Sequence, residues 1–194
     1  MQTHVFHNIS GVHEFIIERE SVCIIYIFLT QIDTHQLSIT TRCLGSGASV
    51  DVRIIHIQKH NETLSLSTIQ HHDAPHTKST VLVKGVLYDH AQLKYNGKIY
   101  VSEQAEHTHA DQKSHTLLLS AMANAQATPS LEVLTKEVQC KHGSAVAALN
   151  ATQVEYLASR GIAYHCAQKI LVESFFLSAL DDQNARDYFI KYLS

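Results

Sequence analysis

The sequence predicts an all-β body with a small α appendage at its C-terminal end. From about residue 20 to residue 140, the chain is a series of short runs in which apolar and polar residues alternate. Alternation with a period of two places one set of side chains on a buried face, as in a β-strand. After Asn150 the apolar residues recur at helical spacing. The predicted organisation is an N-terminal segment (1–20) whose secondary structure the sequence does not decide, a β-structured core (21–149) and a helical domain (150–194).

The β-type runs recur at intervals of roughly 8–12 residues, which is typical of a sandwich, a barrel or a β-solenoid. They lie at 22–29, 50–54, 64–67, 81–83, 98–101, 117–119 and 131–134. Turns are predicted at Gly45-Ser46-Gly47, at Asn61-Glu62 and at 72–75. Asn96-Gly97 predicts a tight hairpin, or a corner if the chain is a solenoid. Periodicity alone does not choose among the three architectures.

Three helices are predicted in the C-terminal domain. Asn150 can cap the first, because Gln153 follows it three residues later, and Gly161 can end it. The second fits Tyr164 to about Leu180. Asp181 or Asp182 can cap a third helix, whose apolar residues are Tyr188, Phe189, Tyr192 and Leu193.

Charge and cysteine usage exclude several classes of protein. The formal net charge is −3 and the lysines and arginines are scattered, so no basic stripe predicts nucleic-acid binding. The four cysteines, at 23, 43, 140 and 166, form no C-x-x-C pair, which argues against a zinc ribbon or a thioredoxin-type site.

The apolar run at 22–29 is too short to span a bilayer, and an acidic stretch precedes it where a signal peptide would be basic. We therefore expect a buried strand there, no membrane association and a cytoplasmic location. No phosphate-binding G-x-x-x-x-G-K-[ST] motif and no G-x-S-x-G motif is present, so nothing in the sequence predicts nucleotide binding or covalent catalysis.

Fifteen histidines are a weak indication of metal binding. The loop at 71–76 holds three imidazoles and Asp73, and His107-Thr108-His109 would place two rings on one face of a strand. Polar surface positions explain both groups more readily. The alternative that they leave open is a free-standing, histidine-rich metal-binding β-domain, which could also be an enzyme.

Cys140-Lys141-His142-Gly143 lies directly before the first predicted helix. On an extended segment, Cys140 and His142 project to the same side, about 7 Å apart along the strand. A thiolate and an imidazole together suit iron, zinc or copper(I). Two ligands do not complete a metal site, so the others would come from a partner or from elsewhere in the chain. A strand end followed by a glycine turn is the structural alternative.

The stretch at 138–162, VQCKHGSAVAALNATQVEYLASRGI, resembles the SufB/SufD family, the scaffold subunits of the SUF iron–sulfur cluster assembly machine, and resembles SufD more closely than SufB. It is similar to the family's Cys-x-His-Gly-Ala-Thr turn and its Phe-Tyr-Leu-x-Ser-Arg-Gly-Ile helix end. Segments 96–99, 117–120 and 129–133 resemble further family landmarks in the expected order. The sequence departs from the pattern at Thr116, Lys136-Glu137, Ala145, Ala147 and Glu155.

The resemblance implies a right-handed parallel β-helix followed by a C-terminal helical domain. It implies a non-enzymatic scaffold that pairs with SufB through the β-helix ends and docks the SufC ATPase on its helical tail, so that this chain itself binds no nucleotide. His142, with Cys140 beside it, would hold iron or a transient iron–sulfur cluster at the subunit interface. Tyr156, Arg160, Phe175 and Phe176 would dock the partner.

Two further expectations concern completeness. The chain is shorter than usual family members, so we expect it to lack their N-terminal helical region and some coils of the β-helix. An unpaired β-helix end exposes a sheet edge that needs cover, so a homodimer is an alternative to the pair with SufB.

Overall fold

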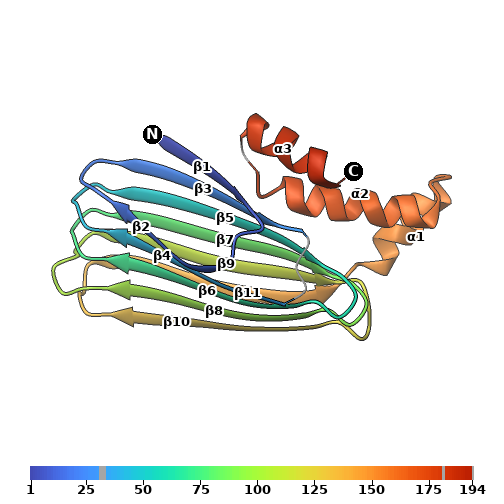
Figure 1. Cartoon of the computed structure of the whole chain (residues 1–194), viewed down its shortest axis with the longest axis horizontal. Helices are drawn as coiled ribbons and strands as arrows, with labels where there is room; N and C mark the ends of the chain where they lie inside the picture. The colour runs from blue at the N-terminus through green and yellow to red at the C-terminus, as the bar shows by residue number, and fades with distance from the viewer. Residues whose placement is uncertain (31–33, 181, 194) are drawn as a thin grey trace.

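A computed structural model describes residues 1–30, 34–180 and 182–193, with the side chains of 34 and 191–193 left undescribed. The described residues form eleven strands in two parallel sheets (Figure 1). The first sheet has the order β1-β3-β5-β7-β9-β11 and the second the order β10-β8-β6-β4-β2. The strand bounds are β1 Gln2–His7, β2 Gly11–Ile17, β3 Val22–Leu29, β4 Thr34–Cys43, β5 Ser49–Gln58, β6 Thr63–His72, β7 Lys78–Leu87, β8 Gln92–Val101, β9 Thr108–Leu118, β10 Asn124–Val133 and β11 Val138–Ala148.

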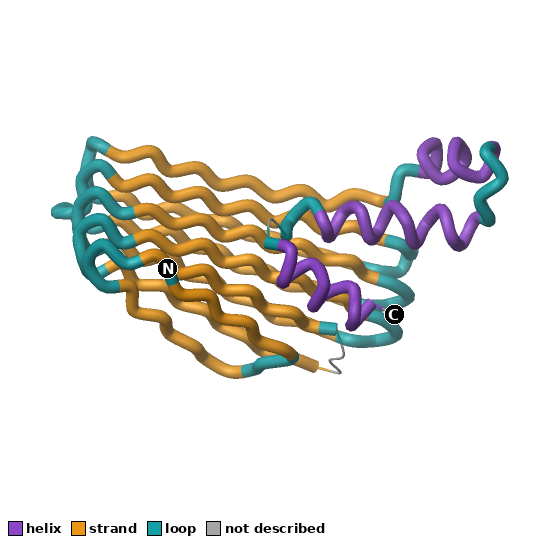
Figure 2. The backbone as a smooth tube through the Cα atoms, turned by 90° about the horizontal axis from the view of Figure 1, so that it is seen from above, coloured by secondary structure: helices purple, strands orange, loops and turns teal. Residues whose placement is uncertain are grey.

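Successive strands alternate between the two sheets, and every pairing is parallel, so the chain winds as a β-helix. This confirms the predicted all-β body with a helical appendage and decides against a sandwich or a barrel. Odd-numbered strands build the first sheet and even-numbered strands the second. Figure 2 shows the resulting stack of nearly parallel strands.

The alternating runs place their apolar residues between the sheets. Ile27, Ile54 and Val83 are register partners on β3, β5 and β7, and none of them is exposed. Each coil repeats the position of the coil before it, so buried residues form columns along the axis of the β-helix. Burial of these columns is the main stabilising contribution to the fold.

The hairpin predicted at Asn96-Gly97 is wrong, and so is the corner that a solenoid would place there. Both residues lie inside β8, where Gly97 pairs with Thr68 on β6 and with Pro129 on β10. A Cβ atom on Gly97 would lie 1.5 Å from the side-chain nitrogen of Gln112, which crosses from the opposite sheet. The glycine therefore provides space for a side chain and does not turn the chain. The turns predicted at 45–47, 61–62 and 72–75 do lie where strands end.

The first twenty residues, whose structure the sequence left open, continue the β-helix. β1 pairs with β3, and β2 pairs with β4, both in parallel. The first coil thus carries the two sheets to the N-terminal end of the chain.

Three helices follow the last strand: α1 Ala151–Ser159, α2 Tyr164–Leu177 and α3 Gln183–Leu193. The side chain of Asn150 accepts a hydrogen bond from the Gln153 backbone, as predicted for the cap of the first helix. Gly161 has a φ of +88°, a conformation that favours glycine at the end of a helix. α3 begins directly after Asp182, while the other predicted cap, Asp181, lies outside the described residues.

α2 and α3 lie over the outer face of the first sheet, whereas α1 lies beyond the strand ends, beside α2 (Figures 1 and 2). Phe176 on α2 and Phe189 on α3 are fully buried and contact each other edge to face. Phe28 on β3 stacks on Phe189 at 5.8 Å between ring centroids. The outward residues of this sheet that bury against the tail are Tyr26, Phe28, Ile55, Ile57 and Val86. The tail is therefore anchored by a second apolar core outside the β-helix.

Candidate functional site at the last coil

The last coil of the β-helix is uncovered among the described residues. β10 and β11 are the final strands of their sheets, so each has a strand neighbour on one side only. Their inner residues, which in earlier coils would be buried, reach the surface. The large apolar side chains exposed here are Leu131 (41%), Val133 (36%), Leu134 (49%) and Val146 (42%). Unpaired strand edges beside exposed apolar residues form a surface suited to pairing with another chain.

Cys140 and His142 belong to β11 and face the inside of this coil. Their register partners on β9 are Ala110 and Gln112, both buried between the sheets. Parallel pairing in register keeps the same side inward on the next strand, so the thiol and the imidazole project to the same side, in the predicted orientation. Gly143, in contrast, is a strand residue and not the turn that the structural alternative required.

The environments of the two side chains differ. Cys140 is half-buried and packs on a small cluster that contains Ile99, Val101 and Ala110. Burial raises the pKa of its thiol, and the backbone of Ala110 opposes that effect in part. His142 is exposed at the open end. The site thus offers an accessible imidazole beside a shielded thiol.

Within the described part of the chain, no group of three or more His, Cys, Asp or Glu side chains could hold a metal ion. Cys140 and His142 therefore remain two candidate ligands. A metal or a cluster held here would need further ligands from another chain or another molecule.

The other histidine groups serve structural contacts. His72 is buried, with its two ring nitrogens 2.7 Å from the hydroxyls of Thr77 and Ser79. His71 points to the outside, 3.1 Å from Asp73, and stacks on Tyr100. His71 and His72 are thus the last residues of β6 and not loop residues, and the alternation of the strand places one imidazole outside and the other inside.

His107 and His109 do not share one strand. His107 lies in a corner with a φ of +57° and stacks on His76, whereas β9 begins at Thr108. The prediction that both rings lie on one face required an extended chain from His107 to His109. The left-handed conformation of His107 interrupts that extended chain.

A buried polar side chain that sequence analysis missed lies directly behind His142. Gln112 is 1% exposed, and its amide nitrogen donates to the hydroxyl of Tyr95 at 3.0 Å. Tyr95 in turn lies 2.7 Å from the hydroxyl of Thr68. The only sequence signal was a polar residue at an inward position of β9, and the strand's boundaries were needed to recognise it.

The four tail residues predicted to dock a partner occupy different environments. Tyr156 is 58% exposed on α1, and the guanidinium of Arg160 lies 5.3 Å from its ring centre. Phe176 is fully buried against the first sheet, and Phe175 is half-buried beside it. Tyr156 and Arg160 are thus accessible to another molecule, whereas Phe176 holds the tail on the β-helix.

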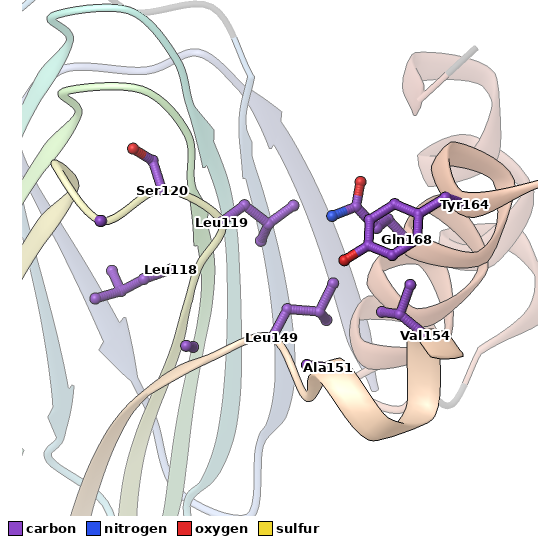
Figure 3. Close-up of a pocket in the computed structure, with 10 residues that line it drawn as sticks. Leu118, Leu119, Ser120, Leu149, Ala151, Val154, Tyr164 and Gln168 are labelled. Carbon is purple, nitrogen blue, oxygen red and sulfur yellow. The ribbon is translucent and has the colours of Figure 1, made fainter. Parts of the chain in front are cut away.

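A pocket of about 350 Å³ lies where the last coil meets the tail (Figure 3). Leu118 and Leu149 line its β-helix side, and Val154, Tyr164 and Gln168 line its helical side. Tyr164 is 56% exposed. The pocket lies at the end of the last coil where β11 continues into α1, whereas Leu131, Val133 and Leu134 lie at the opposite end of β10. No helix among the described residues is long and apolar enough to cross a membrane.

These features define a class of protein: a parallel β-helix with a packed helical tail and an uncovered last coil that presents a thiol and an imidazole. The SufBD core domain of the SUF system for FeS cluster assembly matches residues 6–175. The chain belongs to this family, and it is SufD-like.

Individual relatives support this assignment. The chain is 32% identical over 121 residues to an iron–sulfur cluster assembly SufBD family protein of Synechocystis. This aligned segment covers 62% of this chain and 26% of the relative. It is 27% identical over 136 residues to the iron–sulfur cluster assembly protein SufD of Escherichia coli, covering 70% of this chain and 32% of the relative. SufD of Bacillus subtilis is 27% identical over 143 residues, covering 74% and 33%. The match spans a third or less of each relative.

Proposed function

We propose that this chain is a non-enzymatic scaffold subunit in SUF iron–sulfur cluster assembly. It pairs its last coil with a SufB-like subunit and docks a SufC-like ATPase on its helical tail, so that the partner and not this chain binds the nucleotide. The proposal rests on family membership and on one structural observation. Cys140 and His142 project into the interior of the uncovered last coil, where His142 is exposed and the rim is apolar.

The chemistry of the last coil suits a site shared between two chains. Iron or a nascent cluster is the cargo here, and thiolate and imidazole are both ligands for it. Two ligands from this chain leave coordination positions for a partner's side chains. A partner that covers the coil would bury Leu131, Val133 and Val146, which supplies a hydrophobic contribution to association.

The tail would supply the second contact. Tyr156 on α1 and Arg160 at its C-terminal end are both exposed and contact each other, and the exposed Tyr164 lines the pocket in Figure 3. Tyrosine and arginine are enriched in the energetically important parts of protein interfaces. All four cysteines are free thiols, which suits the reducing cytoplasm that we propose as the location.

Co-expression with SufB-like and SufC-like subunits, followed by affinity purification on this chain, tests the proposal. We expect a stable complex containing all three chains. His142→Ala should leave the complex intact and lower the yield of reconstituted cluster, while the matched change His109→Ala, on the neighbouring strand, should leave that yield unchanged. Recovery of this chain without either partner would contradict the scaffold role, and recovery as a homodimer would assign the last coil to self-pairing.

A further inference from the structure

Behind His142, the interior of the β-helix holds a polar side chain with one unused hydrogen-bonding group. His142 on β11 and Gln112 on β9 are register partners, so neighbouring strands place their backbones about 4.8 Å apart in one inward column. Val81 on β7 is the other neighbour of Gln112 in this column. Of the two side chains flanking Gln112, only the imidazole is polar.

The amide of Gln112 is held in place by contacts from the opposite sheet. Its nitrogen donates to Tyr95 at 3.0 Å, and the absence of a side chain on Gly97 leaves room for it. The carbonyl oxygen of the same amide is buried and has no hydrogen-bond partner among the described residues. A buried acceptor without a partner costs free energy, so a donor that reaches it is favoured.

We propose that Gln112 is a positioning residue for His142: its carbonyl oxygen accepts the N–H of one ring nitrogen and so selects the imidazole tautomer. The second ring nitrogen then carries its lone pair away from Gln112, toward the open end of the coil. An outer partner of this kind fixes the orientation of a metal-ligating histidine and raises its basicity. This inference deepens the proposed function, in which His142 is a ligand, and rests on it.

The tautomer of His142 tests the proposal in the free chain, without a partner or iron. Ring ¹⁵N chemical shifts of histidine-labelled protein distinguish the two neutral tautomers at a pH well above the ordinary imidazole pKa. His142→Ala assigns the signals. In the unsubstituted chain we expect one tautomer of His142 to dominate. Gln112→Met, which keeps the volume but removes the acceptor, should change the tautomer ratio by roughly threefold to tenfold, as the loss of a net hydrogen bond implies.

Two matched changes separate positioning from general damage to the core. Gln112→Glu restores an acceptor and should return the ratio toward that of the unsubstituted chain. The ratio at His109, which lies on β9 with Gln112 but is exposed on the opposite face of the strand, should not change in any variant. If Gln112→Met does not fold, Tyr95→Phe removes the hydroxyl that holds the amide and should also weaken the preference.

An unchanged His142 ratio in the folded variant would overturn the positioning role. The result is distinguishable from a failure of the proposed function. If Gln112→Met shifts the tautomer ratio while His142→Ala leaves the cluster yield of the complex normal, Gln112 is the positioning residue but His142 is not a ligand. If Gln112→Met leaves the tautomer ratio unchanged while His142→Ala lowers the cluster yield, His142 is a ligand and Gln112 does not position it.

Discussion

The imidazole of His56 lies directly over Gly85, its register partner on the neighbouring strand β7. A Cβ atom at position 85 would lie 1.9 Å from the ring carbon Cε1 of His56. The ring is fully buried and cannot move into solvent. Gly85 is therefore required by packing, not by backbone conformation.

Gly85→Ala should destabilise the protein by about 1–3 kcal/mol, as expected for overpacking in a rigid core. Gly143→Ala is the matched control, because no atom lies within 4 Å of its added methyl group. We expect the control to stay within about 0.5 kcal/mol of the parent chain. Urea unfolding of the three proteins measures the difference, and equal midpoints for the two variants would contradict the packing requirement.

Buried histidines should make stability depend on pH. Burial lowers the pKa of His56 to about 4 and is also the main reason that the pKa of His72 lies at about 4. Between about pH 6.5 and pH 4 the unfolded chain takes up a proton at each ring and the folded chain does not. Stability from these groups is therefore complete above about pH 6.5 and is lost as the pH falls toward 4, by on the order of 3 kcal/mol for each ring.

Free energies of unfolding at about pH 7 and about pH 5 test this dependence. His56→Leu should reduce the loss of stability between the two pH values. His109→Gln, at an exposed position, should lose as much stability between these two pH values as the parent chain does. The same slope in His56→Leu and in the parent would show that His56 is not the titrating group.

Lys84 connects the β-helix to its tail. Its ammonium donates to the carbonyl of Phe175 at 2.6 Å and to the hydroxyl of Ser178, and it lies 4.4 Å from the centre of the Phe175 ring. Lys84→Met keeps the apolar stem and removes these contacts. We expect α2 to lose about 1.5–3 kcal/mol of local stability, since hydrogen bonds to charged groups contribute in this range.

Hydrogen exchange resolves whether the effect is local. Amides of α2 should exchange faster in Lys84→Met, while amides of β5 and β6 keep their protection. Lys94→Met, at an exposed position of β8, is the control and should change neither region. Unaltered protection of α2 would mean that the apolar contacts of Phe176 and Phe189 hold the tail without the lysine.

The four thiols should react with iodoacetamide in a definite order. Cys166 is exposed and should react first, followed by Cys140, which is half-buried and has a raised pKa. Cys23 and Cys43 are buried, and the pKa of Cys43 lies at about 12, so both should stay unmodified until the protein unfolds. Peptide mapping by mass spectrometry measures the order. If Cys140 is modified as fast as Cys166, the conclusion that the Cys140 thiol is shielded is wrong.

The local pattern of the chain was sufficient to predict much of the fold. Alternation at 50–54 and 64–67 predicted strands because one sheet face is buried, and this holds for β5 and β6. Asn150 and Gly161 predicted both ends of α1, because capping depends on residues within one turn of the helix. The family resemblance at 138–162 supplied the parallel β-helix, which periodicity alone left among three architectures.

Contacts between coils could not be predicted in this way. Asn96-Gly97 predicted a hairpin from local preference, but Gly97 leaves room for Gln112, which is fifteen residues away in the sequence and reaches it across the interior. The fully buried position of Phe176 likewise depends on the outer face of a sheet built from distant strands.

The sequence by itself determined the alternation that makes strands, the caps that make the helical tail, and a Cys-x-His pair with two ligand atoms on one side of a strand. Only the tertiary structure decided that this strand is the last of its sheet, so that the pair projects into an uncovered coil, with the imidazole exposed and the thiol half-buried. It also placed Gln112 behind His142. Strand order and register bring together residues thirty positions apart, because each coil repeats the position of the coil before it.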